Sequence, residues 1–280
     1  MRFAVTLLLW LLTTVALAVA VPTAWVQTHI VDVDGYTAMA KRASSDPVLQ
    51  AAVASELATR TTVLINQHGH RVDPSTVHDV AAGYTAGPDF PTEFADANRM
   101  AHDWMFTGAN AQSQGDQWVV DLSAMLKDSA FAPMLSNAHV QVPETVRVPV
   151  TVTNSKILQP GKLRPLATWG RWVATAAAAV TGICALLTLA VARSRGRALA
   201  GLGISALLVG AAGWAAIELG RHRLGDALNH TTGDIRRIAD VMVGDAESSL
   251  HHWLDLTLAA GGVLVALGVL AAVLGSLRKS

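Results

Sequence analysis

Four long apolar runs constrain this chain more than any other feature. They cover residues 3–21, 169–192, 198–219 and 253–277. Each approaches or exceeds the roughly 20 apolar residues that a helix needs to cross the hydrocarbon core of a bilayer. Only 15% of the residues are charged, against about 25% in an ordinary soluble domain. The sequence therefore predicts a multi-pass membrane protein with four membrane helices.

The first apolar run allows two interpretations. Ala18 and Ala20 give the small-x-small arrangement of a signal-peptidase site. However, Arg2 is the one basic residue before the run, and the run is longer than the roughly 7–15 residues of a signal-peptide core. We expect a retained anchor helix, which gives the chain an even number of crossings, and cleavage is the alternative.

Basic residues beside the apolar runs predict the orientation of the chain. Three short segments carry them: Arg2, then Arg193, Arg195 and Arg197, and finally Arg278 and Lys279. Lys and Arg in short loops favour the cytoplasmic side. With four crossings, all three segments lie on one side of the plasma membrane. Both termini are then cytoplasmic, and segments 26–165 and 221–252 are extracytoplasmic.

The composition of segment 26–165 excludes one class of partner. Acidic residues outnumber basic residues in it, which argues against a nucleic acid. The chain has one cysteine, Cys184, inside a predicted membrane helix. The exported part must therefore be stable without an intramolecular disulfide.

Helix start signals organise the extracytoplasmic segment. Asp46 suits an N-cap and Pro47 the first helical position, and a second helix is predicted to open at Asp73 in the same way. The stretch 82–91 is predicted to be a loop because it is rich in Gly and Pro. The candidates for the buried side of the first of these helices are Val48, Ala52, Leu57 and Leu64.

A third helix carries a group of polar residues that resembles a catalytic cluster. Its apolar face is predicted to hold Phe90, Phe94, Ala97, Ala101 and Met105. Its polar residues are Asn98, Arg99, His102 and Asp103. Arg99 and Asp103 have the spacing of an ordinary helical ion pair, and Asn98 or a backbone carbonyl can satisfy the imidazole. We interpret the group as the structural seam of a packed helix, with a ligand or partner site as the alternative.

The fold class expected from these patterns is mainly α. Segments 118–122 and 146–154 alternate as strands, with Pro149 at an edge or bulge. The expected architecture is a four-helix transmembrane anchor plus a mostly helical extracytoplasmic domain with a small two-stranded β element. The expected domains are an anchor at 1–25, the extracytoplasmic domain at 26–165, and a three-helix membrane domain at 166–280.

The loop at 220–252 has an amphipathic helical pattern. Its apolar residues are Leu224, Leu228, Thr231, Ile235, Ile238, Met242 and Leu250. The helix is expected to pack on the extracytoplasmic domain, because its polar face lacks the basic excess of a membrane-surface helix. Lying on the membrane is the alternative.

Five stretches together indicate a family. They are "VDVDGY", "SDPVLQAAVASEL", "EFADANRMAH", "WVVDL" and "VPVTVTNS", followed by three closing membrane helices. In order and topology the chain resembles a large group of uncharacterised integral membrane proteins of actinobacteria. The resemblance implies an architecture and a cell-envelope setting without implying a reaction. The residues that match the helix pattern of that group are Asn98, Arg99 and His102.

A histidine-rich loop is the strongest chemical signal, and we do not expect it to bind a metal. His68, His70, His78 and Asp79 supply donors that zinc or copper accepts. Their spacing fits no helical metal pair, so metal binding is the alternative. No nucleophile elbow, phosphate loop or cysteine pair occurs. We therefore expect no cofactor, no catalytic residues and no enzyme.

The ionisable residues at the membrane boundary are predicted to form a cluster. Arg171, Glu218 and Asp255 reach a similar depth at the outer ends of three membrane helices, and His252 lies nearby. Charges that face hydrocarbon are costly, so we expect them to face one another. A structural clamp is the favoured interpretation, and a proton or ligand site is the alternative.

The sequence thus favours a non-enzymatic cell-envelope protein. Its outer domain is expected to bind a partner protein or to self-associate, with membrane lipid as its other partner. The alternative is an accessory subunit of a transporter or lipid-handling system with a cavity at the outer leaflet.

Overall fold

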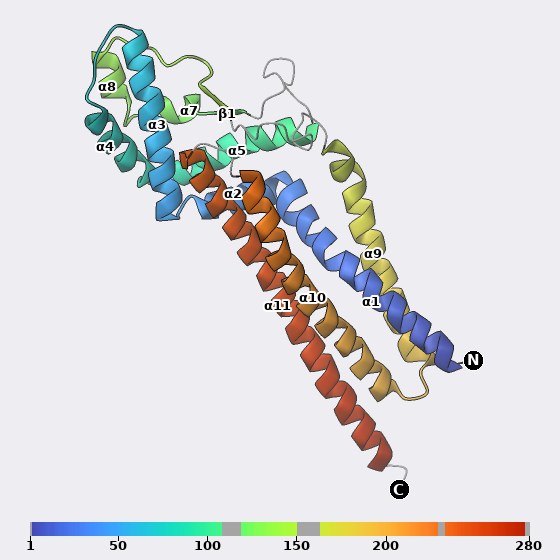
Figure 1. Cartoon of the computed structure of the whole chain (residues 1–280). Coiled ribbons are helices and arrows are strands. Elements are labelled where there is room, and N and C mark those ends of the chain that lie inside the picture. The colour runs from blue at the N-terminus through green and yellow to red at the C-terminus, as the bar shows by residue number, and fades with distance from the viewer. Residues whose placement is uncertain (1, 108–118, 150–162, 229–232, 278–280) are drawn as a thin grey trace. The chain divides into compact units, whose positions relative to one another are not determined.

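The computed structural model describes residues 2–107, 119–149, 163–228 and 233–277 (Figure 1). Contacts within the chain define two compact units. The membrane unit consists of Met1–Thr28, Leu166–Arg223 and Glu247–Ser280, and the globular unit consists of His29–Pro165 and Leu224–Ala246. Each unit is therefore built from segments that are distant in the sequence.

Four helices make up the membrane unit. They are α1 (Arg2–Val26), α9 (Arg164–Val191), α10 (Arg195–Leu228) and α11 (Gly233–Leu277). All four are long and apolar enough to cross a membrane. This confirms the prediction of a multi-pass membrane protein with four transmembrane helices.

Helices α10 and α11 lie side by side (Figure 1), so close that a Cβ atom added to several of their glycines would meet the opposite backbone. A Cβ atom added to Gly203 would lie 2.6 Å from the carbonyl oxygen of Gly261, and one added to Gly268 would lie 2.4 Å from the amide nitrogen of Ala200. Gly261 and Gly268 therefore lie where the two helices approach closely enough to exclude a side chain. Gly275 continues the seven-residue spacing, but nothing lies within 4 Å of an added Cβ there.

Helix α1 joins α10 through hydrogen bonds inside an apolar bundle. The indole Nε1 of Trp10 donates to the carbonyl oxygen of Gly201 at 2.8 Å. The hydroxyl oxygens of Thr14 and Ser205 lie 2.8 Å apart, and Ser205 is 1% exposed. Such interhelical bonds stabilise membrane helix packing by about 0.6–1.7 kcal/mol each.

The globular unit is helical. Its elements are the π-helix η1 (Gln27–Val31), α2 (Val33–Ala43), α3 (Pro47–Gln67), α4 (Pro74–Thr85), α5 (Phe90–Thr107), α7 (Ser123–Leu126), α8 (Ala132–Asn137) and the first part of α11. The chain passes from the membrane unit into the globular unit within η1. Asp46 and Asp73 accept hydrogen bonds from the first amides of α3 and α4, and Pro follows each of them. Both predicted helix starts are confirmed.

Two local predictions for this unit are wrong. Helix α4 continues to Thr85 and α5 begins at Phe90, so the expected loop 82–91 is reduced to four residues. Val48 is 53% exposed, because the buried side of α3 passes through Leu49, Val53 and Leu57. Ala52 and Leu57 are buried as predicted, and Leu64 is partly buried against the core.

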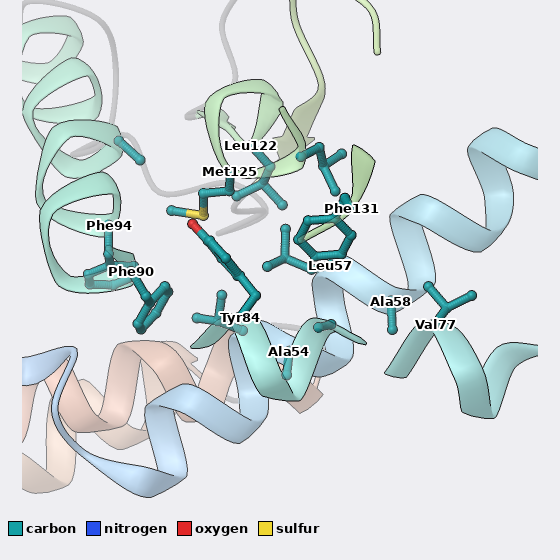
Figure 2. Packing of buried hydrophobic residues seen from close by; sticks show 14 of the residues in the cluster. Ala54, Leu57, Ala58, Val77, Tyr84, Phe90, Phe94, Leu122, Met125 and Phe131 are labelled. Carbon is teal, nitrogen blue, oxygen red and sulfur yellow. The ribbon is translucent and has the colours of Figure 1, made fainter. Parts of the chain in front are cut away.

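The core of the globular unit gathers apolar residues from helices along most of the chain (Figure 2). The ring of Tyr84 makes edge contacts with Phe90 and Phe131, with ring centroids 5.7 and 5.4 Å away. Leu57 and Phe131 are fully buried. The three rings come from α4, α5 and the start of α8, so they fix these segments together.

The amphipathic part of α11 packs into the same core. Ile235 is 8% exposed, and Ile238 and Met242 are partly buried against the cluster. The hydroxyl of Ser55 donates to Asp234 Oδ2 at 2.7 Å. Packing on the globular unit is therefore confirmed for this part. Thr231 lies outside the described residues, as do the side chains of Leu224 and Leu228.

The prediction of a two-stranded β element in the fold is wrong. Pairing is limited to three residues on each side, β1 (Val119–Asp121) and β2 (Arg147–Pro149). Pro149 lacks an N–H group and cannot extend the pairing. The carboxylate of Asp121 accepts the amides of Ser123 and Val146, which turns the chain out of the strand direction. Residues 150–154 lie outside the described part, and the described fold is α-helical with one local bridge.

Candidate functional site

His102 is the most deeply buried of the polar residues that the sequence analysis singled out. It is 4% exposed, and its Nε2 atom lies 3.0 Å from the carbonyl oxygen of Ile30 and 3.1 Å from that of Val31. Two carbonyl acceptors require that Nε2 carries the proton and donates. Those carbonyls belong to the last residues of η1, where a helix leaves its acceptors unpaired. His102 therefore caps the end of the π-helix from a distant part of the chain.

Aromatic rings enclose the imidazole. The ring of Phe106 stacks on it with centroids 4.4 Å apart, and the ring of Tyr36 lies 5.2 Å away at a tilt of 39°. The Nδ1 atom is buried and lies 3.9 Å from Asp103 Oδ1, which is too far for a hydrogen bond. His102 therefore lies in the interior of the globular unit, and of the two partners that the sequence allowed it takes backbone carbonyls.

The neighbouring polar residues join α5 to α2. The Asn98 amide donates to the carbonyl of Phe94, and the Tyr36 hydroxyl lies 3.4 Å from Asn98 Oδ1. Arg99, which was expected to pair with Asp103, lies 3.5 Å from both Asp34 Oδ1 and Thr37 Oγ1 of α2. The Arg99–Asp34 pair is solvent-exposed, so it contributes little to stability. The geometry is that of a structural seam between two helices.

Both tyrosines of the chain have perturbed hydroxyls. Burial raises the pKa of Tyr36 to about 12. The pKa of Tyr84 is raised further, first by burial and then by its hydrogen bond to Glu93 and by the carboxylates of Glu93, Asp128 and Asp89. Both phenols therefore stay neutral in the folded protein at pH values where an exposed tyrosine ionises.

These shifts predict a delayed alkaline titration. A tyrosine whose pKa is higher in the folded state than in the unfolded state stabilises the fold at every pH below the unfolded-state pKa of about 10. This stability is lost as the pH rises from that value toward the folded-state pKa. We expect no phenolate absorbance in the folded chain at pH 10.5, and titration near pH 10 in denaturant. Because the chain holds two tyrosines, ultraviolet absorbance reads both groups directly. A half-ionised native protein at pH 10 would contradict the burial of both hydroxyls.

Carboxylates surround an open pocket beside Tyr84. The pocket has a volume of about 380 Å³, and its lining includes Asp79, Asp89 and Asp128. The carboxylates repel one another and favour a cation. Among the described residues, however, no three His, Cys, Asp or Glu side chains are arranged to hold a metal ion.

The histidines of the histidine-rich loop lie in different surroundings. His68 Nδ1 lies 2.9 Å from the carbonyl oxygen of Leu64 in its own helix. His70 stacks with His139, with ring centroids 6.2 Å apart. His78 lies exposed on α4. The described part of the chain thus holds these histidines apart from any common centre.

Two of the residues predicted to cluster at the membrane boundary, Glu218 and Asp255, bond to other groups. Glu218 Oε2 lies 4.0 Å from Arg221, whose guanidinium lies 3.3 Å from Glu247. The Trp214 indole donates to Asp255 Oδ1 at 3.2 Å. Arg171 is exposed on α9, and no ion pair joins it to a carboxylate of the described residues. His252 is also exposed, and it is His251 that stacks on Trp214, with ring centroids 3.9 Å apart. The structure therefore does not bring Arg171, Glu218 and Asp255 together.

Sequence reasoning missed the pairing of His102 with η1. One sequence signal was available. The helical segment continues from α1 into residues 27–31, and these residues include no Gly or Pro that would end the helix locally. The carbonyl groups at the end of such a helix need hydrogen-bond donors from elsewhere in the chain. Sequence reasoning also missed Trp10 as a donor to Gly201. A tryptophan in the middle of a membrane helix needs a hydrogen-bond acceptor.

Fold and contacts define a multi-pass α-helical membrane protein with a helical globular unit. Comparison with protein-family models, curated proteins and solved structures gave no match. The resemblance to actinobacterial membrane proteins therefore stays a prediction.

Proposed function

We propose that the chain is a non-enzymatic cell-envelope protein whose globular unit binds a partner protein or a second copy of itself. One observation supports this proposal. The residues of α5 that were candidates for chemistry are engaged in internal bonds: His102 to Ile30 and Val31, and Arg99 to Asp34. His102 holds the end of η1 and Arg99 is paired within the unit, so the remaining surface of the unit is what it can offer to other molecules.

The proposed orientation places both termini in the cytoplasm and the globular unit outside the plasma membrane. The arginines at the α9–α10 connection support it, because Arg193 is exposed in the short loop and Arg195 is exposed at the start of α10. Cysteine labelling of intact cells tests the orientation in a Cys184→Ala background. We expect an impermeant maleimide to react with Ser75→Cys on α4 and not with Ser194→Cys. The opposite pattern would reverse the topology.

Photo-crosslinking in the native membrane tests the binding function. Val63 on α3 and Met100 on α5 are each 46% exposed, so a photoreactive residue at either position reaches a neighbouring molecule. We expect crosslinks to one recurring polypeptide, and two differently tagged copies of the chain distinguish self-association from a different partner. Leu187 of α9, 45% exposed, is the matched control and should crosslink to lipid.

Crosslinks from Val63 and Met100 to lipid alone would overturn the proposal. That result would favour the second candidate, an accessory subunit of a transporter or lipid-handling system. Its supporting observation is a pocket of about 400 Å³ between helices of the membrane unit, lined in part by Leu189, Leu199 and Ala271. In the proposed orientation this pocket lies at the inner leaflet and not at the outer leaflet expected from the sequence.

A further inference from the structure

The pocket in the membrane unit combines apolar walls with a cationic rim. It has a volume of about 400 Å³ and is lined by Leu189, Ala190, Arg195, Gly196, Leu199 and Ala271. Three helices supply these residues: α9, α10 and α11. Leu186, one helical turn before Ala190 on α9, is 68% exposed. The walls therefore suit a hydrocarbon chain.

Arg195 lines the pocket, and this arginine and the two arginines near it in the sequence have no carboxylate near them in the chain. Arg193, Arg195 and Arg197 are all exposed. No Asp or Glu occurs between Glu144 and Glu218, or after Asp255. Among the described residues no ion pair involves these arginines. Three guanidinium groups thus face the solvent without an internal counter-charge, and they attract anions.

Arginines at this position also set the orientation of a membrane protein, so the charge alone identifies no ligand. The pocket is an independent observation, because orientation requires no cavity between helices. Guanidinium groups bind phosphate oxygens well. The free amides at the start of α10, a helix of 34 residues, add a favourable dipole for the same anion.

We propose that this pocket binds an anionic phospholipid. The phosphodiester lies against Arg195, with Arg193 and Arg197 supplying further positive charge. One acyl chain occupies the apolar pocket beside Leu189 and Leu199. The inference is independent of the partner-binding function proposed above, and the topology decides only which leaflet supplies the lipid.

Native mass spectrometry of the delipidated full chain tests this site. The probes are phosphatidylglycerol, phosphatidylcholine and inorganic phosphate, each titrated in detergent. We expect phosphatidylglycerol to bind at least about tenfold more tightly than phosphatidylcholine, because each arginine near the headgroup favours the anionic lipid by about fivefold. Equal affinity for the two lipids would overturn the proposal. Thermal stabilisation by inorganic phosphate equal to that by phosphatidylglycerol would also overturn it, because the site would then need no acyl chain.

Two variants separate the headgroup from the acyl chain. Arg195→Gln should weaken phosphatidylglycerol binding about fivefold and leave phosphatidylcholine unchanged. Leu199→Trp fills the pocket and leaves the arginines intact, and it should weaken the binding of phosphatidylglycerol. Arg71→Gln, a change to an exposed arginine of the globular unit, is the matched control and should bind like the parent. If both pocket variants retain the parent's affinity, the pocket is not the lipid site.

Discussion

Replacing Gly268 with Leu is expected to separate α10 from α11 and to lower the stability of the membrane unit by about 3 kcal/mol or more. The first atom of the new side chain would lie 2.4 Å from the amide nitrogen of Ala200 and 2.7 Å from the carbonyl oxygen of Gly196. Neither backbone atom can move without moving its helix. Thermal unfolding of the purified chain in mild detergent, followed by helical circular dichroism, measures the loss.

Gly275 provides a matched control on the same helix. An added Cβ there meets nothing within 4 Å, so Gly275→Leu should be neutral or slightly stabilising, since Leu favours a helix by somewhat under 1 kcal/mol relative to Gly. Gly203→Leu should repeat the loss from the α10 side, because its Cβ would lie 2.6 Å from the carbonyl oxygen of Gly261. Equal melting of the Gly268 and Gly275 variants would show that this face of α11 does not pack on α10.

Replacing His102 with Ala is expected to destabilise the globular unit by about 2–4 kcal/mol. The change leaves the carbonyls of Ile30 and Val31 without their donor, and an unsatisfied buried acceptor costs about 1–3 kcal/mol. It also removes the ring that stacks on Phe106 and leaves a cavity. Limited proteolysis of the chain in detergent, together with its melting temperature, measures the effect.

Two further variants separate the causes. His102→Phe restores ring volume without the donor, so it should recover part of the stability and not all of it. His78→Ala changes an exposed histidine of α4 and should melt like the parent. A His102→Ala chain that melts normally but loses its crosslinks from Met100 would instead show that the imidazole belongs to a partner site.

Sequence reasoning predicted the features that local chemistry determines. The apolar runs are long enough to identify four membrane helices, and Asp46 with Asp73 identified two helix starts because an N-cap acts within one turn. The face through Phe90, Phe94, Ala97, Ala101 and Met105 is buried as predicted, because helical periodicity aligns these residues whatever covers them.

Features that depend on distant segments were not predictable in this way. Arg99 was assigned to Asp103 by helical spacing, yet the structure pairs it with Asp34 of another helix. Arg171, Glu218 and Asp255 were grouped by depth alone. Depth does not specify rotation about a helix axis, which decides which side chains meet.

The two units of this chain cannot finish folding in the order in which they are synthesised. Ile235 belongs to the core of the globular unit but follows all of α9 and α10 in the sequence. When residues 29–165 leave the ribosome, their core still lacks the segment that carries this side chain. It closes only after the third apolar helix has been made, so residues 29–165 must wait partly folded while the later helices are synthesised.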